Sequence, residues 1–186
     1  MFIIKNNYYL YIENTVSVSL DYIKKNKKIT IIYRNNGPQE NYEKLYKFRQ
    51  NCRLKKFKFY VANNVKLATY CKADGLYLSS YNKKRYPKNK LNLIGSAHNF
   101  SEIYEKIKQG CNTIILSRLF KTSYKNKKHY FGIIRFNLMK KNYLTNLIPL
   151  GGINSNNLLK LNLVKSKGLC LLSEIKKKPV ISNRLF

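Results

Sequence analysis

Short apolar runs recur along the whole chain, and turn residues follow each of them. Most of these runs are continuously apolar and rich in tyrosine, isoleucine, leucine and valine, instead of alternating with polar residues. That pattern is typical of strands buried on both faces of a parallel sheet. The strands predicted in this way cover residues 8–12, 29–33, 59–61, 75–78, 91–94, 113–116, 147–150 and 168–172.

Amphipathic helical patterns lie between several of these strands. Residues 41–52 form one predicted helix, and Arg49 falls on its apolar face, so we expect the aliphatic stem of Arg49 to lie on the core while the charged head reaches water. That face comprises Tyr42, Leu45, Tyr46 and Arg49.

Two further helices are predicted towards the C-terminus. Residues 101–109 form the first, which begins at Asn99 as N-cap with Glu102 three residues later and ends at Gly110. Residues 155–164 form the second. The leucines on its predicted inner face are Leu158, Leu159 and Leu163.

Strands that alternate with helices predict a βα repeat around a parallel sheet. Eight such units give the α/β class and a compact single-domain (β/α)8 TIM barrel. Because such barrels typically need about 250 residues and this chain has 186, we expect some helices to be shortened, first the one after strand 75–78. No internal domain boundary is visible, so the barrel is expected to cover residues 1–175, followed by a basic C-terminal tail, 176–186.

The charge balance is strongly positive, with 37 Lys and Arg against 8 Asp and Glu and a formal net charge of +29. The only aspartates are Asp21 and Asp74, which speaks against mechanisms that need clustered carboxylates. A basic chain with interleaved aromatic residues can bind nucleic acid or anionic substrates. However, Lys, Asn, Tyr and Ile recur in every segment, which favours a compositional bias, and specific nucleic-acid binding is not expected.

Four widely spaced cysteines, Cys52, Cys71, Cys111 and Cys170, form no C-x-x-C pair. They are predicted to be reduced structural thiols, without a zinc site. No apolar run approaches the 18 residues of a membrane span, and residues 1–13 lack an export signal. We therefore expect a cytoplasmic protein without a membrane partner.

In a barrel of this kind the functional groups lie at the carboxyl ends of the strands. Cations, amides, hydroxyls and glycine backbone dominate these positions, and carboxylates are missing, so the set is suited to binding phosphate. The glycine pair follows the seventh strand, where barrel enzymes commonly hold a phosphate. The candidate residues are Arg34, Asn63, Ser96, His98, Thr122, Lys125, Gly151, Gly152 and Ser173.

Seven short segments at or near these ends carry a resemblance to a known family. They are Tyr33-Arg34, Phe59–Asn64 followed by Leu67-Ala68, Ala73–Leu78, Ile94–Asn99, Phe120-x-Thr122-x-x-Lys125, Gly151–Asn154 and Leu171–Ile175. No single motif is specific, but in this order and spacing the chain resembles the thiamine phosphate synthase and thiazole tautomerase superfamily of barrels.

The resemblance implies an enzyme of thiamine biosynthesis that joins an aminopyrimidine diphosphate to a thiazole phosphate and releases diphosphate. Its partners would be phosphorylated small molecules, and the oligomeric state stays open. In the family, the positions of Arg34, Asn63, Ser96 and Lys125 hold the diphosphate, and those of Thr122, Gly152 and Ser173 hold the thiazole phosphate. Among the candidates, Arg34, Lys125 and His98 are assigned catalytic roles.

One departure from the family concerns its metal ion. The family synthase binds Mg²⁺ through two aspartates, and the matching positions here are Asn64 and Asn82. A neutral amide loses the charge that holds a hard dication, so no metal ligand is assigned and Mg²⁺ in the family's manner is not expected. We hypothesise that the lysine and arginine runs 83–85 and 125–128 take over part of the metal's role, the alternative being that they are solvated.

Two other functions stay open. In the tautomerase branch, which does not need the metal aspartates, the histidine matching His98 is the base for proton transfer, although His98 could merely support the helix start. The chain could also be a degenerate, non-catalytic barrel that binds phosphorylated ligands or RNA. The retained diphosphate set, above all Arg34, Asn63 and Lys125, favours the synthase-like interpretation.

Overall fold

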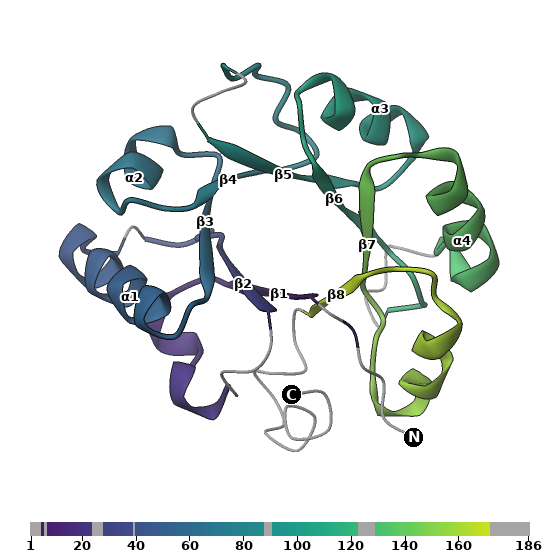
Figure 1. The fold of residues 1–186 in the computed structure, drawn as a ribbon, viewed down its shortest axis with the longest axis horizontal. Coiled ribbons are helices and arrows are strands. Elements are labelled where there is room, and N and C mark those ends of the chain that lie inside the picture. Colours follow the sequence, from purple (N-terminus) through teal and green to yellow (C-terminus); the bar gives the residue numbers. More distant parts are fainter. Residues whose placement is uncertain are drawn as a thin grey trace.

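The computed structural model describes residues 5, 7–23, 28–38, 40–87, 91–122 and 129–171. Its centre is a closed barrel of eight parallel strands in sequence order, β1 to β8 (Figure 1). All eight predicted strands are confirmed, and with them the (β/α)8 barrel. The strands are β1 (Asn7–Ile12), β2 (Lys28–Tyr33), β3 (Lys58–Ala62), β4 (Gly75–Leu78), β5 (Asn92–Ala97), β6 (Thr113–Ser117), β7 (Asn146–Leu150) and β8 (Gly168–Leu171).

Helices lie around the outside of this ring (Figure 1). The α-helices are α1 (Tyr42–Leu54), α2 (Val65–Tyr70), α3 (Phe100–Lys108) and α4 (Gly132–Asn142). Short 3₁₀ turns make up η1 (Thr15–Ser17), η2 (Leu20–Tyr22), η3 (Ser155–Asn157) and η4 (Leu159–Leu163). Between β4 and β5 the described residues 79–87 form no helix, which agrees with the shortening expected there. No described helix has both the length and the apolar character needed to cross a bilayer.

The strands pair in parallel around the whole ring, but the extent of the pairing varies. The register of β1 with β2 runs over six residue pairs, from Asn7 with Lys28 to Ile12 with Tyr33. Between β7 and β8 the described register is a single pair, Leu150 with Cys170.

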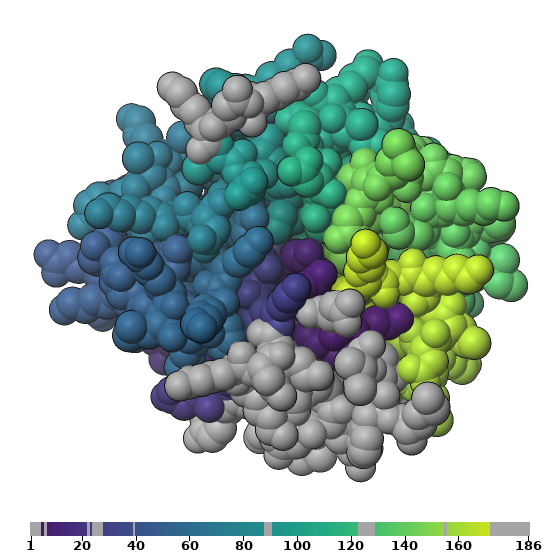
Figure 2. Space-filling model, viewed as in Figure 1, coloured from purple at the N-terminus to yellow at the C-terminus, as the bar shows by residue number. Residues whose placement is uncertain are grey.

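The core has an inner and an outer part. The ring that looks open in the ribbon is filled by side chains in the space-filling view (Figure 2). The inner cluster consists of Tyr9, Tyr11, Ile32, Tyr60, Tyr77, Ile94, Ile115, Ile148 and Cys170, and a second, larger cluster lies between the strands and the helices. Tyr60 packs over Gly75, where a Cβ would lie 2.5 Å from the Tyr60 ring carbon Cε1. All four cysteines are free and buried, as predicted for structural thiols.

The prediction for Arg49 was wrong. Its head does not reach water: only 8% of the residue is exposed, and Nη2 forms an ion pair with Asp74 Oδ1 at 3.1 Å. Nε donates to the carbonyl of Lys72 at 3.1 Å, and Asp74 Oδ2 accepts from the backbone N–H of Phe59 at 2.7 Å. The guanidinium therefore pairs with a carboxylate instead of reaching water, and the pair connects α1 to the residue just before β4.

The prediction of one continuous helix over residues 155–164 is also wrong. The segment forms η3 and η4 instead, and Leu159 and Leu163 point to solvent, with exposures of 73% and 65%. Leu161 and Val164 are buried and Leu158 is partly buried, so the inward positions recur every third residue. That period belongs to a 3₁₀ helix.

Candidate active site

The carboxyl ends of the strands bring most of the candidate residues to one rim of the barrel. Arg34 directly follows β2, Asn63 follows β3, Ser96 lies near the end of β5, His98 directly follows that strand, and Gly151 directly follows β7. Thr122 lies in the segment after β6. Lys125 and Ser173 lie outside the described residues, as do the lysines of run 125–128 and the tail 176–186.

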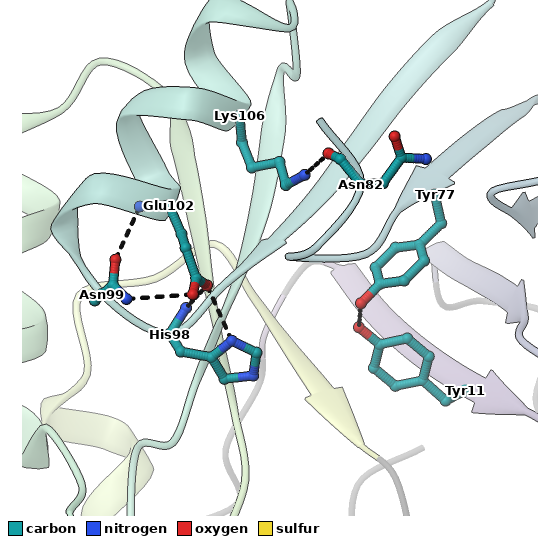
Figure 3. Close-up of polar contacts among 7 residues, drawn as sticks. All are labelled: Tyr11, Tyr77, Asn82, His98, Asn99, Glu102 and Lys106. Atoms are coloured by element: carbon teal, nitrogen blue, oxygen red, sulfur yellow. Dashed lines mark hydrogen bonds and ion pairs between the residues drawn. The ribbon is translucent and has the colours of Figure 1, made fainter. Parts of the chain in front are cut away.

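Two tyrosine hydroxyls meet inside the barrel among the apolar side chains of the inner cluster. The hydroxyls of Tyr11 and Tyr77 are hydrogen-bonded at 2.7 Å, and the two rings meet edge to face (Figure 3). Burial raises the pKa of both phenols, while the charge of Arg34 opposes that rise. The neighbouring Ser96 hydroxyl also lowers the pKa of Tyr77. Arg34, directly after β2, and Ser96, in β5, therefore both act on one buried pair of hydroxyls.

Asn63 has a structural task at the rim. Its backbone is left-handed, with φ of 56°, and its side-chain amide donates to the hydroxyls of Ser79 at 2.7 Å and Tyr81 at 3.1 Å. The amide oxygen accepts from the Ser79 backbone N–H at 3.0 Å and from Asn82 Nδ2 at 2.9 Å. Because both donors and the oxygen are engaged, Asn63 would contact a ligand only by exchanging one of these bonds. No pattern in the sequence indicated these partners.

Asn64 and Asn82, the positions that the resemblance pairs with metal-binding aspartates, do not fit a divalent cation. Asn64 Oδ1 accepts from the backbone N–H of Leu67 at 3.0 Å and caps α2. Asn82 Oδ1 accepts from the backbone N–H of Lys84 at 2.9 Å, and its amide nitrogen faces Asn63. Both oxygens thus serve the protein's own N–H groups, and neither carries the charge that a hard dication requires. Within the described part of the chain, no three His, Cys, Asp or Glu side chains gather around a possible ion.

The glycine pair lies against the segment that follows β6. Gly151 and Gly152 both have positive φ, 95° and 71°, and a Cβ on Gly152 would lie 2.6 Å from the carbonyl oxygen of Lys121. The backbone N–H groups of Gly152 and Ile153 donate to no other described residue. Successive N–H groups in such a turn form a concave site for an anion.

A cation that the sequence analysis did not single out lies beside this turn. A Cβ on Gly151 would lie 2.9 Å from Cγ of Arg118, and Arg118 Nη1 donates to the hydroxyl of Thr122 at 3.0 Å. The backbone N–H of Phe120 donates to the carbonyl of Gly151 at 3.1 Å. The structure therefore brings Thr122, Arg118 and the glycine pair together, and Arg118 is a strand-end residue to which the sequence alone gave no role.

His98 stands at the start of α3, where the predicted capping is confirmed. Asn99 Oδ1 accepts from the backbone N–H of Glu102 at 2.9 Å (Figure 3). Glu102 Oε2 accepts from the backbone N–H of His98 at 2.8 Å and lies 3.0 Å from its ring Nδ1. The His98 side chain is half exposed, and Nε2 has no partner among the described residues. The ring thus supports the helix start and keeps one nitrogen available.

Comparison with known proteins gives a consistent result. A model of the family described as thiamine monophosphate synthase matches residues 2–175. The thiamine-phosphate synthase of Prochlorococcus marinus (strain AS9601) is 26% identical over 148 residues, which are 77% of this chain and 42% of that protein. The thiamine-phosphate synthase of a second Prochlorococcus marinus strain is 32% identical over 124 residues, 63% of this chain and 35% of that protein. The chain therefore spans less than half the length of these relatives.

Solved structures agree on the fold. The thiamine phosphate pyrophosphorylase from Pyrococcus furiosus superposes with a TM-score of 0.71 at 18% identity, covering 96% of this chain and 91% of that one. The one from Bacteroides thetaiotaomicron gives 0.60 at 14% identity, with 91% and 83% covered. Since the family model matches nearly the whole chain, this protein belongs to the thiamine monophosphate synthase family.

Proposed function

We propose that this chain joins an aminopyrimidine diphosphate to a thiazole phosphate and releases diphosphate. Its family membership supports this reaction. The observation that carries the proposal is the turn after β7, where Arg118 lies against Gly151 and donates to Thr122, and where the N–H groups of Gly152 and Ile153 donate to no other described residue. Backbone N–H groups, a guanidinium and a hydroxyl are the donors that a phosphate monoester binds.

The reaction needs charge stabilisation more than acid–base chemistry. The bond between the pyrimidine methylene carbon and the diphosphate oxygen breaks, and its electron pair leaves with the diphosphate. The lone pair of the thiazole nitrogen then forms the new carbon–nitrogen bond. Negative charge grows on the departing diphosphate, so donors and cations placed around it lower the barrier.

The diphosphate is assigned to the opposite side of the rim, at β2, β3 and β5. Arg34 is the cation of this set within the described residues, Ser96 supplies a hydroxyl, and Asn63 fixes the shape of the rim and can exchange one amide bond. Lys125 completes the set as a prediction from the sequence. The thiazole phosphate is assigned to Thr122, Gly151, Gly152 and, again from the sequence alone, Ser173.

A tautomerase is the second candidate, because of the geometry at His98. Glu102 Oε2 lies 3.0 Å from Nδ1 of His98, and a carboxylate there favours a proton on Nδ1, which leaves Nε2 as the basic nitrogen. Such a pair suits proton abstraction from a thiazole phosphate. This candidate uses the same phosphate site and makes no use of Arg34.

The decisive assay mixes the purified chain with both phosphorylated substrates, with EDTA and with added Mg²⁺, and follows thiamine phosphate and diphosphate by chromatography. We expect product in EDTA, at a rate that Mg²⁺ changes by less than about tenfold. Arg34→Gln should lose at least about a hundredfold in kcat/KM, as expected for a cation on the leaving group. Arg53→Gln, an exposed arginine of α1, is the matched control and should leave the rate unchanged.

The variants also separate the alternatives. His98→Asn should leave the coupling rate within about threefold of wild type, whereas it should abolish isomerisation of the thiazole if the chain is a tautomerase. Coupling that disappears in EDTA and returns with Mg²⁺ would refute the metal-free form of the proposal. Conversion of neither substrate, with inorganic phosphate still bound, would refute catalysis and leave a binding protein.

A further inference from the structure

A buried lysine is bonded to the backbone of Asn82, one of the two residues that the resemblance matches to the family's metal-binding aspartates. Lys106 of α3 is 1% exposed, and its Nζ donates to the carbonyl oxygen of Asn82 at 2.6 Å (Figure 3). The same nitrogen donates to Gln109 Oε1 at 2.9 Å. No described carboxylate forms an ion pair with it. Two neutral oxygens therefore hold a buried ammonium, and one of them belongs to the rim.

The sequence makes room for this lysine at Gly95. A Cβ on Gly95 would lie 2.8 Å from Cγ of Lys106, so any larger residue in β5 would push the lysine stem out of its place. Burial lowers the pKa of Lys106, and the nearby Glu102 and Glu105 are among the groups that oppose this shift. Burying the Lys106 ammonium costs free energy of folding, so we look to its hydrogen bonds for the function that this cost supports.

Those contacts fix the loop between β4 and β5. Besides Lys106 Nζ, Gln109 Nε2 donates to the Asn82 carbonyl at 2.9 Å and to the Lys84 carbonyl at 2.7 Å. From the other side, Asn82 Nδ2 donates to Asn63 Oδ1 at 2.9 Å and to the hydroxyl of Tyr86 at 3.1 Å. A continuous chain of hydrogen bonds thus runs from the ammonium through Asn82 to Asn63, a residue assigned to the substrate.

These hydrogen bonds link the loop after β4 to the end of β3 without any charged ligand. A dication would draw the ends of β3 and β4 together through charged ligands at positions 64 and 82. Here Asn82 is held by a cation on its backbone side, and its side chain joins the β3 end by a neutral amide bond. The positive charge behind the loop also opposes the approach of a second cation.

We propose that the ammonium of Lys106 replaces a divalent cation as the charge that holds this rim, and that no divalent cation binds between Asn64 and Asn82. Lys106 is a positioning residue: it acts on the substrate through Asn82 and Asn63. The part of the inference that concerns substrate rests on the proposed function, whereas the metal exclusion and the fixing of the loop do not.

The first test titrates Mn²⁺ into the full chain and follows free Mn²⁺ by electron paramagnetic resonance. We expect no saturable site with a Kd below about 1 mM. A stoichiometric site of Kd below about 0.1 mM that Asn82→Ala removes would overturn the exclusion.

The second test compares Lys106→Met with Lys108→Met, which removes the same charge from an exposed position two residues away on α3. Hydrogen exchange of residues 79–87 should be at least about tenfold faster in Lys106→Met and unchanged in Lys108→Met. Pyrophosphate, without metal, should bind about tenfold more weakly to Lys106→Met, the equivalent of one charge-assisted hydrogen bond. The positioning role would be overturned if the two variants exchanged at equal rates, or if a folded Lys106→Met bound pyrophosphate as tightly as wild type.

Two further measurements keep the result decisive. If Lys106→Met does not fold, Gln109→Leu removes the bonds to the Asn82 and Lys84 carbonyls together with one of the two acceptors of the Lys106 ammonium. It keeps the bond from Lys106 to Asn82 and should show the same faster exchange to a smaller degree, whereas exchange as in wild type would overturn the role of these bonds in fixing the loop. If the wild-type chain binds no pyrophosphate, the proposed function fails, while the Mn²⁺ and exchange results still decide whether Lys106 holds the loop.

Discussion

Removing Asp74 should destabilise the barrel far more than removing its partner. Asp74 accepts two bonds, from Arg49 Nη2 at 3.1 Å and from the backbone N–H of Phe59 at 2.7 Å. In Asp74→Ala the guanidinium stays buried with the Lys72 carbonyl as its remaining partner among the described residues, and Nη1 is already without one. An uncompensated buried charge is among the most destabilising changes a protein can suffer.

The exposure of the two side chains sets the expected magnitude. Arg49 is 10% exposed at its side chain and Asp74 is 33% exposed. Breaking a fully buried pair costs about 3–5 kcal/mol, and because water reaches Asp74 we expect the lower end, about 3 kcal/mol. For a chain of this length that corresponds to a fall in Tm of about 6–12 °C. Arg49→Met should cost only about 1 kcal/mol, because it replaces the buried charge by an apolar chain and leaves Asp74 on the Phe59 N–H.

Urea unfolding followed by circular dichroism measures both variants and the double variant. Asp21→Ala is the control: Asp21 pairs with Lys55 at 2.9 Å but is 84% exposed, so its loss should cost less than about 0.5 kcal/mol. The double variant should be more stable than Asp74→Ala, since it removes the stranded charge. An Asp74→Ala variant no less stable than Arg49→Met would refute this reasoning.

Three other changes test the pH dependence, the anion site and the start of α2. Burial raises the pKa of the Cys111 thiol from 9.0 to about 12, so between these pH values the folded chain binds more protons than the unfolded chain and the free energy of unfolding falls as pH rises. Between pH 8 and pH 10, Cys111→Ala should lose about 1.4 kcal/mol less of this free energy than wild type in urea unfolding. Equal losses in the two proteins would contradict this. Gly152→Ala should lower the stability by at least about 2 kcal/mol and weaken the binding of inorganic phosphate, both measured by calorimetry. Gly37→Ala is the control and should change neither quantity, because φ of Gly37 is not positive and a Cβ there would meet nothing closer than 3.6 Å. Asn64→Ala should cost about 1 kcal/mol of stability through loss of the α2 cap, while Asn64→Asp, which keeps the cap, should stay near wild type in thermal melting.

The strands could be predicted from the sequence because their signal is local. A run such as 113–116 or 147–150 is apolar throughout and sits between turn residues, which suits burial from both sides of a parallel sheet. Once the order of strands and helices is known, the closed ring follows with few alternatives. Membership of one rim then follows for residues such as Arg34 and Gly151, since the carboxyl ends of parallel strands lie together.

What the sequence could not supply was the partner of each polar side chain. Arg49 lies on an apolar stripe, and only the fold shows that Asp74 meets it there. Lys106 presents the same conflict: it follows Ile103 by three residues, on the face that packs against the barrel, while its charge suggests solvent. The spacing placed Arg49 correctly on the inner face, whereas no prediction was made for Lys106. The sequence predicted that the Asn63 side chain binds the substrate, and the structure shows its amide hydrogen-bonded to residues of the rim.

The turn after β7 is bonded to the segment that follows β6. The backbone N–H of Leu119 donates to the carbonyl of Leu150 at 2.9 Å, and that of Phe120 donates to the carbonyl of Gly151 at 3.1 Å. A phosphate held by residues of both segments would add contacts between two neighbouring sectors of the barrel. Because such a ligand binds the folded chain and not the unfolded one, occupancy of the site should raise the melting temperature of the whole barrel.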